Sequence, residues 1–273
     1  MTAAALPEHP FDRAVRLDTV EPGLLRGATE PAWANMVGPF GGITAAVLLR
    51  AVECHPDRIG EPLALTVNYA APIADGGFDI ALRAARTNRS NQHWILELRQ
   101  DDTVKTTATA VFGRHRDTWA DNEAVAPHTV APEEVQRSSF LDAIVWAKLY
   151  DMRFTDGPVP ATTVAPSASS ATTLWVRDTD QRPLDFAALA AVCDVFYPRV
   201  FLRRGRFLPA GTISLTTYFH ADRAGVDAVG GDFVLGSAHA NAFSRGYFDQ
   251  SAHLWSRSGQ LLTSTHQLVY FKD

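Results

Sequence analysis

The chain has 273 residues, of which 46% are hydrophobic and 20% charged, and its formal net charge is −5. These values are typical of a globular protein and exclude an intrinsically disordered chain. A net negative charge also argues against binding of nucleic acid, which needs a basic surface. The N-terminal segment lacks the pattern of a signal peptide, and no apolar run reaches the ~18 residues of a membrane span. We therefore expect a cytoplasmic protein with no membrane contact.

The first third of the chain predicts one helix followed by several strands. The helix covers residues 42–54, is almost entirely apolar, and is stopped by Pro56. The segments that follow are rich in Val, Ile, Leu and Thr and are separated by turn formers. We expect strands at residues 63–69, 78–87, 93–101 and 103–112.

A less regular stretch separates this region from the rest of the chain. Residues 138–150 (SSFLDAIVWAKLY) predict a surface helix, and residues 155–173 are rich in Pro, Ser, Ala and Thr, which indicates an exposed connection. The expected organisation is an N-terminal unit at 1–115, a linker with a helix at 116–147, and a C-terminal unit at 148–273.

The last third repeats the pattern of the first. A helix is expected at 183–196, and strands at 211–220, 232–241, 245–256 and 261–271. AVECHP, LTVNYAAP and KTTATAVF in the first region correspond to AVCDVFYP, LTTYFHAD and LTSTHQLV in the second, roughly 150 residues later. In this alignment Ala110 takes the place of Gln267.

The order of elements predicts the fold. Short connections between strands favour antiparallel sheets, and a helix that is apolar nearly all round must be covered on most sides. We therefore expect an α+β double hot-dog, with two repeated halves that each wrap an antiparallel sheet around a central helix. Cys54 and Cys193 lie in apolar helical segments and are expected to be reduced core residues.

Asp194 is the most unusual residue of the second helix. It lies near the end of the helix, on a flank lined by Ala187 and Ala190, where the helix dipole does not favour a carboxylate and desolvation is costly. Such an acid is either a structural hydrogen-bond acceptor or a functional carboxylate with a shifted pKa. Thr212, which opens a strand, and Gln267, which interrupts the apolar side of another, favour the functional interpretation.

At these residues the chain resembles the bacterial type II acyl-CoA thioesterases and the wider thioesterase-like group with a double hot-dog fold. The resemblance covers essentially the whole chain and rests on VGPFGGITAAVLL, LWVRD, AVCDVF, GTISLTTYFH and STHQ. It implies that Asp194, Thr212 and Gln267 together hold and activate a hydrolytic water. Two departures are Ile43, where the family commonly has Gln, and Ser214-Leu215, where it has an acid and a His.

Two further groups are candidates for binding an acyl-CoA. Phe40, Gly41 and Gly42 open the first helix, where backbone N–H groups could bind the thioester carbonyl, although glycines there equally suit tight packing of helix on sheet. The segment PRVFLRRGRF is either a phosphate-binding cluster or a solvated basic loop. Its four arginines are Arg199, Arg203, Arg204 and Arg206, of which Arg203 and Arg204 are the expected substrate ligands.

Other functions remain open from the sequence. A nucleophilic serine hydrolase is disfavoured because G-x-S-x-G is missing. The chain could instead bind acyl-CoA without hydrolysing it, or act as a hydratase or dehydratase with a His and an acid at the site. His266 should not share the site of Gln267, because neighbouring residues of a strand point to opposite faces. We expect no cofactor and no metal, and by analogy a homo-oligomer.

Overall fold

The computed structural model describes residues 8–160 and 162–273. The strands of these residues belong to one large antiparallel sheet. The order across the sheet is β1 (Asp18–Glu21), β2 (Leu24–Ala28), β4 (Gly77–Thr87), β5 (Asn91–Gln100), β6 (Thr103–Gly113), β3 (Glu61–Tyr69), β9 (Ala210–Phe219), β13 (Leu261–Phe271), β12 (Tyr247–Ser256), β10 (Val234–His239), β8 (Thr172–Asp178) and β7 (Tyr150–Asp156), with β11 (Phe243–Ser244) paired to β12.

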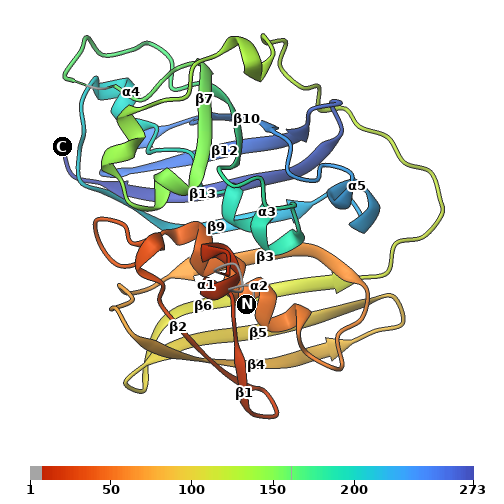
Figure 1. Cartoon of the computed structure of the whole chain (residues 1–273). Helices are drawn as coiled ribbons and strands as arrows, with labels where there is room; N and C mark the ends of the chain where they lie inside the picture. The colour runs from red at the N-terminus through yellow and green to blue at the C-terminus, as the bar shows by residue number, and fades with distance from the viewer. Residues whose placement is uncertain (1–7, 161) are drawn as a thin grey trace, which may run out of the picture.

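The two repeated regions meet at the centre of this sheet (Figure 1). β3 from the first pairs antiparallel with β9 from the second, and Thr66 lies directly opposite Thr216. The two hydroxyl oxygens are 3.0 Å apart, and the two residues are 150 positions apart in sequence. The repeat seen in the sequence is therefore a spatial one, with its approximate twofold axis close to this pair.

Two helices lie against each other between the sheet regions, α2 (Gly41–Glu53) and α3 (Phe186–Val192). They run antiparallel, because Gly42 at the beginning of α2 approaches Ala191 near the end of α3, whereas Arg50 near the end of α2 pairs with Asp185 at the beginning of α3. Apolar side chains on all sides of α2 are buried, which favours this central position. Among the described residues, no helix has the length and apolarity needed to cross a membrane.

The predicted surface helix at 138–150 is wrong. The segment forms two 3₁₀ turns, η3 (Phe140–Ala143) and η4 (Trp146–Leu149), and continues into β7. Trp146 and Ala147 are buried, and the Trp146 ring stacks on Phe40 with 3.9 Å between centroids. Trp146 and Ala147 are thus drawn into the core, which a regular surface helix would not allow.

Other boundaries also differ from the prediction. α3 is shorter than 183–196, because the Asp185 side chain accepts a hydrogen bond from the Ala188 N–H and so caps the helix at its beginning. β7 and β8 were missed: they pair with each other at the sheet edge beyond β10, at the ends of the predicted exposed connection. The sequence likewise gave no prediction of β1, β2, α1 (Pro10–Ala14), α4 (Val200–Arg204) or α5 (Arg223–Asp227).

The expectation for the two cysteines holds only for one of them. Both are free, and Cys193 is buried with its sulfur 3.3 Å from the hydroxyl of Thr263. Cys54 is exposed, because it is the C-cap of α2 and the chain turns away from the core there, towards Pro56.

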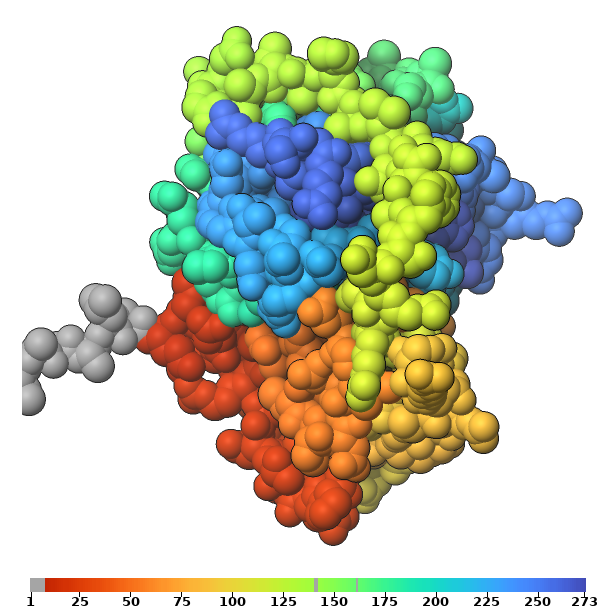
Figure 2. All heavy atoms as spheres, turned by 90° about the vertical axis from the view of Figure 1, so that its right-hand side faces the viewer, coloured from red at the N-terminus to blue at the C-terminus, as the bar shows by residue number. Residues whose placement is uncertain are grey.

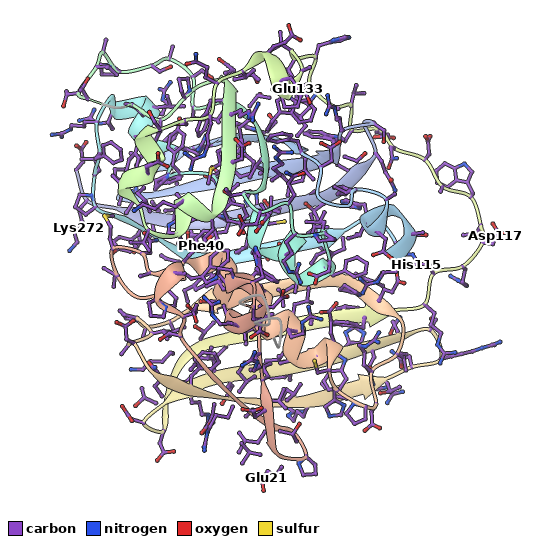
Figure 3. The ribbon with its side chains drawn as sticks, viewed as in Figure 1. Glu21, Phe40, His115, Asp117, Glu133 and Lys272 are labelled. Atoms are coloured by element: carbon purple, nitrogen blue, oxygen red, sulfur yellow. The ribbon has the colours of Figure 1, made fainter. Side chains whose placement is uncertain are left out.

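The connection between the repeated regions runs along one face of the second (Figure 2). Figure 3 places His115 and Asp117 at the side of the molecule and Glu133 at the far end of the second region. Along this path Ala124 and Ala126 pack on a small apolar cluster, and the indole nitrogen of Trp175 donates to the carbonyl of Val130 at 2.9 Å. The connection therefore covers apolar residues on the outer face of β8, β10 and β12.

Candidate active site

Asp194 lies just beyond α3, beside the beginning of α2. Its backbone N–H donates to the carbonyl of Ala191 at 3.1 Å, which fixes it one turn past the buried alanines of the helix. The side chain is only partly exposed, and it comes from the second half of the chain. A carboxylate at this end of α3 meets the negative end of the helix dipole, so its stabilisation must come from elsewhere.

The stabilisation comes in part from the first half of the chain. The backbone N–H of Gly42, in the first turn of α2, donates to the Asp194 carboxyl group. α2 has no side-chain cap of its own at Phe40, so Asp194 takes the position of a capping acid. Close approach requires glycine, because a Cβ on Gly41 would lie 2.6 Å from Oδ2 of Asp194.

Gln267 and Thr212 complete the cluster from the second half. Nε2 of Gln267, which is 2% exposed in the middle of β13, donates to Oδ1 of Asp194 at 2.9 Å. The hydroxyl of Thr212 donates to Oε1 of Gln267 over 3.5 Å, at the upper limit of hydrogen-bond length. Thr212 stands opposite Val269, at an irregularity in the pairing of β9 with β13. The structure thus brings together the three residues that the sequence singled out.

Burial changes the acidity of this group. Desolvation raises the pKa of Asp194 to about 7, although the hydrogen bonds from Gln267 and Gly42 act in the opposite direction. The phenol of Tyr69 lies beside it and donates to the carbonyl of Gly41 at 2.8 Å. Burial and the nearby Asp194 carboxylate raise the pKa of Tyr69 as well, so the phenol stays protonated. A carboxyl group that titrates near neutral pH can take a proton from a bound water.

Comparison with known proteins decides the family. The acyl-CoA thioesterase N-terminal domain matches residues 29–113, and the acyl-CoA thioesterase C-terminal domain matches residues 122–271. The chain belongs to the acyl-CoA thioesterase family. No curated protein matches it.

Solved structures agree on the fold. A conserved protein of unknown function with hot-dog fold from Alicyclobacillus acidocaldarius is 45% identical, with a TM-score of 0.93 over 97% of this chain and 99% of that one. A putative thioesterase II from Thermobifida fusca is 18% identical, with a TM-score of 0.84 over 98% and 99% of the two chains. The tesB protein of Mycobacterium avium subspecies paratuberculosis is 18% identical, with a TM-score of 0.79 over 96% and 98%. The acyl-CoA thioesterase domains of this chain thus have a hot-dog fold with a large antiparallel sheet.

The repeated half lacks the amide of the cluster. Ala110 pairs with Leu65 across β6 and β3, as Gln267 pairs with Leu215 across β13 and β9, so the alignment of Ala110 with Gln267 made from sequence is confirmed. Ala110 is buried and apolar. It can orient neither a water nor a carboxylate.

The helix arrangement of the other half is also different. The beginning of α3 is capped by its own Asp185, whose carboxylate also binds Arg182 at 2.8 Å and Arg50 at 3.1 Å. Glu53, at the end of α2, pairs with Arg50 at 3.0 Å and lies 3.8 Å from Arg223. Asp185 and Glu53 are the acids near this second position. Their oxygens face arginines and the backbone, so neither takes the place that Asp194 has in the cluster.

Of the predicted substrate ligands at the beginning of α2, Gly41 and Gly42 border the cluster, whereas the side chain of Phe40 does not. The ring of Phe40 is 2% exposed and lies between Trp146 and Trp33. Figure 3 shows Phe40 at the junction of the two halves. It therefore packs the core beneath the beginning of α2. Gly42 uses its N–H on Asp194, and a Cβ at that position would clash with the carbonyl of Ala191, so both glycines also have a packing role.

The four arginines of the basic segment do not form one cluster. Arg199 is completely buried and donates to Oε1 of Gln250 at 3.1 Å and to the hydroxyl of Thr172 at 2.6 Å, so neither the phosphate-cluster nor the solvated-loop interpretation applies to it. Arg204 and Arg206 each pair with Asp273 at 2.7 Å. Arg203, at the end of α4, donates to the carbonyl of Ala168. A phosphate group would have to compete with these partners.

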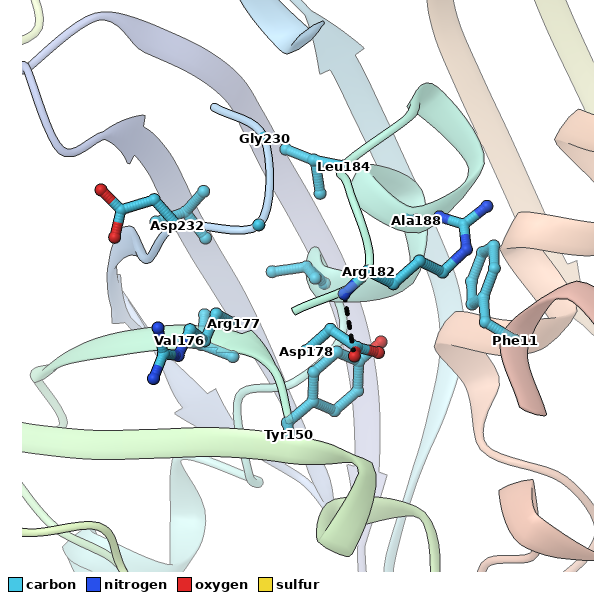
Figure 4. Close-up of a pocket in the computed structure, with 13 residues that line it drawn as sticks. Phe11, Tyr150, Val176, Arg177, Asp178, Arg182, Leu184, Ala188, Gly230 and Asp232 are labelled. Carbon is cyan, nitrogen blue, oxygen red and sulfur yellow. Dashed lines mark hydrogen bonds between the residues drawn. The ribbon is translucent and has the colours of Figure 1, made fainter. Parts of the chain in front are cut away.

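A cavity on the other flank of α3 contains none of the cluster residues (Figure 4). Tyr150, Leu184 and Ala188 form its apolar wall, and the backbone N–H of Arg182 donates to Asp178 at 3.3 Å beside it. The Arg182 guanidinium is occupied by Asp12 and Asp185. The charged groups there hold the N-terminal helix and α3 in place. Among the described residues no group of three or more His, Cys, Asp or Glu is arranged to hold a metal ion.

Sequence reasoning missed Tyr69, and it assigned the backbone N–H groups at Gly41 and Gly42 to the thioester carbonyl, whereas the Gly42 N–H binds Asp194. A signal for Tyr69 existed, because the repeat places Phe219 at the equivalent position, so only one copy carries a hydroxyl. The ring of Phe219 contacts Phe186 at the beginning of α3, as Tyr69 contacts the beginning of α2. The bond of the Gly42 N–H to Asp194 could not be foreseen, since it depends on how the two helices pack.

Proposed function

We propose that this protein hydrolyses an acyl-CoA thioester to a carboxylic acid and free CoA, with Asp194 as the general base. The observation that supports this most directly is the Asp194 carboxyl group, which accepts hydrogen bonds from Gln267 at 2.9 Å and from the N–H of Gly42, and whose desolvation raises its pKa to about 7. A thioester needs only a positioned water, a base near that water, and donors where charge develops on oxygen.

In the proposed reaction Asp194 takes a proton from water while the water oxygen bonds to the thioester carbon. The carbonyl oxygen gains negative charge, the tetrahedral intermediate collapses with cleavage of the C–S bond, and the proton on Asp194 passes to the CoA thiolate. Thr212 and Gln267 orient the water and the carboxylate. No cofactor takes part. Arg203 and Arg204 are proposed to bind phosphates of CoA.

The same proposal includes the arrangement of the chain. Each half is a hot-dog with its sheet wrapped around a central helix, the first unit at 1–115 and the second at 148–273, joined by a linker at 116–147. The catalytic carboxyl then lies at the contact of the two units, because Asp194 comes from one and Gly42 from the other.

A hydratase or dehydratase is less well supported. Such an enzyme needs a His beside an acid at the site. The five strand-associated histidines, His93, His220, His239, His253 and His266, are exposed or only partly buried, unlike Gln267. His266 contacts Ser251 on the face opposite to Gln267, as the alternation of the strand predicted.

A thiol-release assay over a panel of acyl-CoA esters separates an enzyme from a binding protein. We expect release of free CoA together with the matching carboxylic acid from at least one ester. Tight binding of acyl-CoA without release would identify a non-catalytic binding protein. Release of CoA without the acid would contradict hydrolysis.

A further inference from the structure

Four strands meet at the middle of the sheet, β6, β3, β9 and β13, and their outer face is almost free of charge (Figure 1). Side chains alternate along each strand, so the residues between the buried ones point outward, away from the core. In these fully described strands the only Asp, Glu, Lys or Arg residues are Glu61 and Lys105, near opposite ends of the β3–β6 pair. We call the outer residues between these ends the central face. It includes Thr66, Thr109, Thr216, Tyr218, His266 and Leu268.

The outer face of the neighbouring strands is charged in the ordinary way. On β2, β4 and β5 it carries Arg26, Asp79, Glu97 and Arg99, which form ion pairs across and along the strands. Residues that face water in a soluble protein normally include many charges. A patch without them, bordered by charged residues, has instead the composition of the core of a protein–protein interface.

Large apolar side chains are concentrated on the same surface. Tyr218 is 51% exposed and Leu268 is 41% exposed, and Ile95, Tyr247 and Tyr270 are exposed at the borders of the central face. The linker covers the apolar outer residues of β8, β10 and β12, but it leaves Tyr218 and Leu268 in contact with water. Single exposed apolar residues are common, whereas a cluster of them marks an interaction site.

Histidines on this side of the sheet bond to serines rather than to acids. Nε2 of His220 lies 2.8 Å from Oγ of Ser264, and Nδ1 of His266 lies 2.9 Å from Oγ of Ser251. Burial, and after it the neighbouring His253, lowers the pKa of His220, so this ring is neutral at pH 7. His220 therefore adds no charge to the central face at neutral pH.

The symmetry and charge of the central face favour a second copy of this chain as its partner. The approximate twofold axis of the repeat emerges on this face beside Thr66 and Thr216, so both sides of the face follow the same strand framework. Identical chains most often associate through the same patch on both, about a twofold axis. The chain has a net charge of −5, so two copies repel each other least where uncharged surfaces meet.

The area of the face is sufficient for a stable contact. The strands from β5 to β12 across the centre lie about 4.8 Å apart, and about seven residues of each at ~3.4 Å give roughly 700 Å² per chain. Two such faces together remove roughly 1,400 Å² from water, which exceeds the ~1,000 Å² expected of a specific interface.

We propose that two copies of this chain associate through the central face, sheet against sheet, about a twofold axis. Gln267 lies on the opposite face of β13 and contacts Asp194 there, so both candidate sites stay outside the contact. The dimer needs no change in the site, and the inference is independent of the proposed hydrolysis.

Sedimentation equilibrium of the full chain at neutral pH tests the contact, with Tyr218→Glu and Thr109→Glu as variants. Both residues are exposed, so a carboxylate there leaves the core intact but buries an unpaired charge in the contact. Between about 1 and 100 µM we expect the wild type to reach twice the 29.8 kDa of one chain, and each variant to dimerise at least about tenfold more weakly. Circular dichroism should show both variants folded.

Val20→Glu is the matched control. Val20 is 48% exposed on β1, at the far edge of the sheet from the central face, and its replacement adds the same charge. It should leave the dimer intact. A wild type that stays at the mass of one chain would overturn the inference, and so would an assembly that survives both substitutions on the central face. Equal dissociation by Val20→Glu would place the contact elsewhere and also contradict it.

Discussion

At the scale of single residues, Asp194 combines two properties that oppose each other in most proteins. It is sufficiently buried for its pKa to rise to about 7, yet it keeps two hydrogen-bond donors that favour the charged form. The balance leaves a group that is a usable base at neutral pH and still returns its proton readily. A surface aspartate would remain ionised and be a weaker base.

The pH dependence of hydrolysis follows from this pKa. The active form of a general base is deprotonated, so kcat/KM should rise about tenfold per pH unit below 7 and level off above it. The measurement is thiol release between about pH 5.5 and 8.5. A profile that is flat across this interval would mean that Asp194 does not supply the rate-determining proton transfer.

The raised pKa of Asp194 should also make the free energy of unfolding fall as the pH rises. The pKa of Asp194 is raised in the folded state from 3.8 to about 7, so between these values the folded protein holds a proton that the unfolded chain has released. Stability from this group is therefore lost as the pH rises from about 4 to 7. Asp194→Asn cannot ionise and should gain stability relative to the wild type by up to about 2 kcal/mol at pH 8, allowing for partial solvent screening.

Thermal unfolding of both proteins at pH 4 and pH 8 measures this difference. The advantage of the variant should be small at pH 4, where Asp194 is protonated in the folded protein and about 40% protonated in the unfolded chain. An advantage that is the same at both pH values would show that the carboxyl is not desolvated in the folded protein.

The sequence made Asp194 and Gln267 visible because each breaks an apolar pattern in its own element, and Thr212 because it opens a strand and matches the family resemblance. Tyr69 was not found, although it differs from its counterpart Phe219 in the repeat, because nothing local distinguishes it from ordinary strand residues. Arg199 was grouped with neighbouring arginines by spacing. Its burial depends on packing against Gln250 and Thr172, residues that are distant in sequence.

At the scale of elements, the beginning of α2 shapes the site. The helix has no side-chain cap there, and Asp194 takes that place from another element. Gly41 and Gly42 permit the approach by their lack of a side chain. A side chain added at Gly41 or Gly42 should displace the Asp194 carboxylate before it disturbs the fold.

Gly41→Ala tests this arrangement. A Cβ at position 41 would stand 2.6 Å from Oδ2 of Asp194, so the carboxyl must move. We expect a loss of kcat of at least about tenfold, because small displacements of a catalytic group are costly, with little change in melting temperature. Gly77→Ala is the control, since the nearest atom to its Cβ would be 3.8 Å away. Equal activity of the two variants would contradict the proposed role of the α2 beginning.

Elements with a strong periodic pattern were predictable, and the remainder were not. α2 and the strands β3 to β6 follow from apolar runs between turn formers. The segment around Trp146 has a helical pattern, but stacking of Trp146 on Phe40 overrides it. The pairing of β7 with β8 bridges a Pro- and Ser-rich stretch, so its signal is non-local.

At the scale of the whole molecule, two repeated halves share one candidate site. The position of Gln267 is occupied by Ala110 in the other half, and the beginning of α3 is capped by its own Asp185. The two halves thus share one framework, and in the described part of the chain the Asp194–Gln267–Thr212 cluster occurs in the second half alone. The first half contributes Tyr69 and the beginning of α2 to that cluster.

Binding stoichiometry tests the single site. Calorimetric titration with a non-hydrolysable acyl-CoA analogue should give one equivalent per chain. Two equivalents with similar affinity would show that the half with Ala110 also retains a binding site.

The most direct test of the account is the rate of thiol release by Asp194→Asn, measured on protein shown to be folded by circular dichroism and thermal unfolding. The amide keeps the size of the carboxyl and can still accept a hydrogen bond from Gly42, but it cannot take a proton from water. We predict a rate below about 1% of the wild type, as expected when a general base is lost. A folded variant with a near-native rate would contradict the role of Asp194, and a rate near one half would mean that both halves of the chain are active.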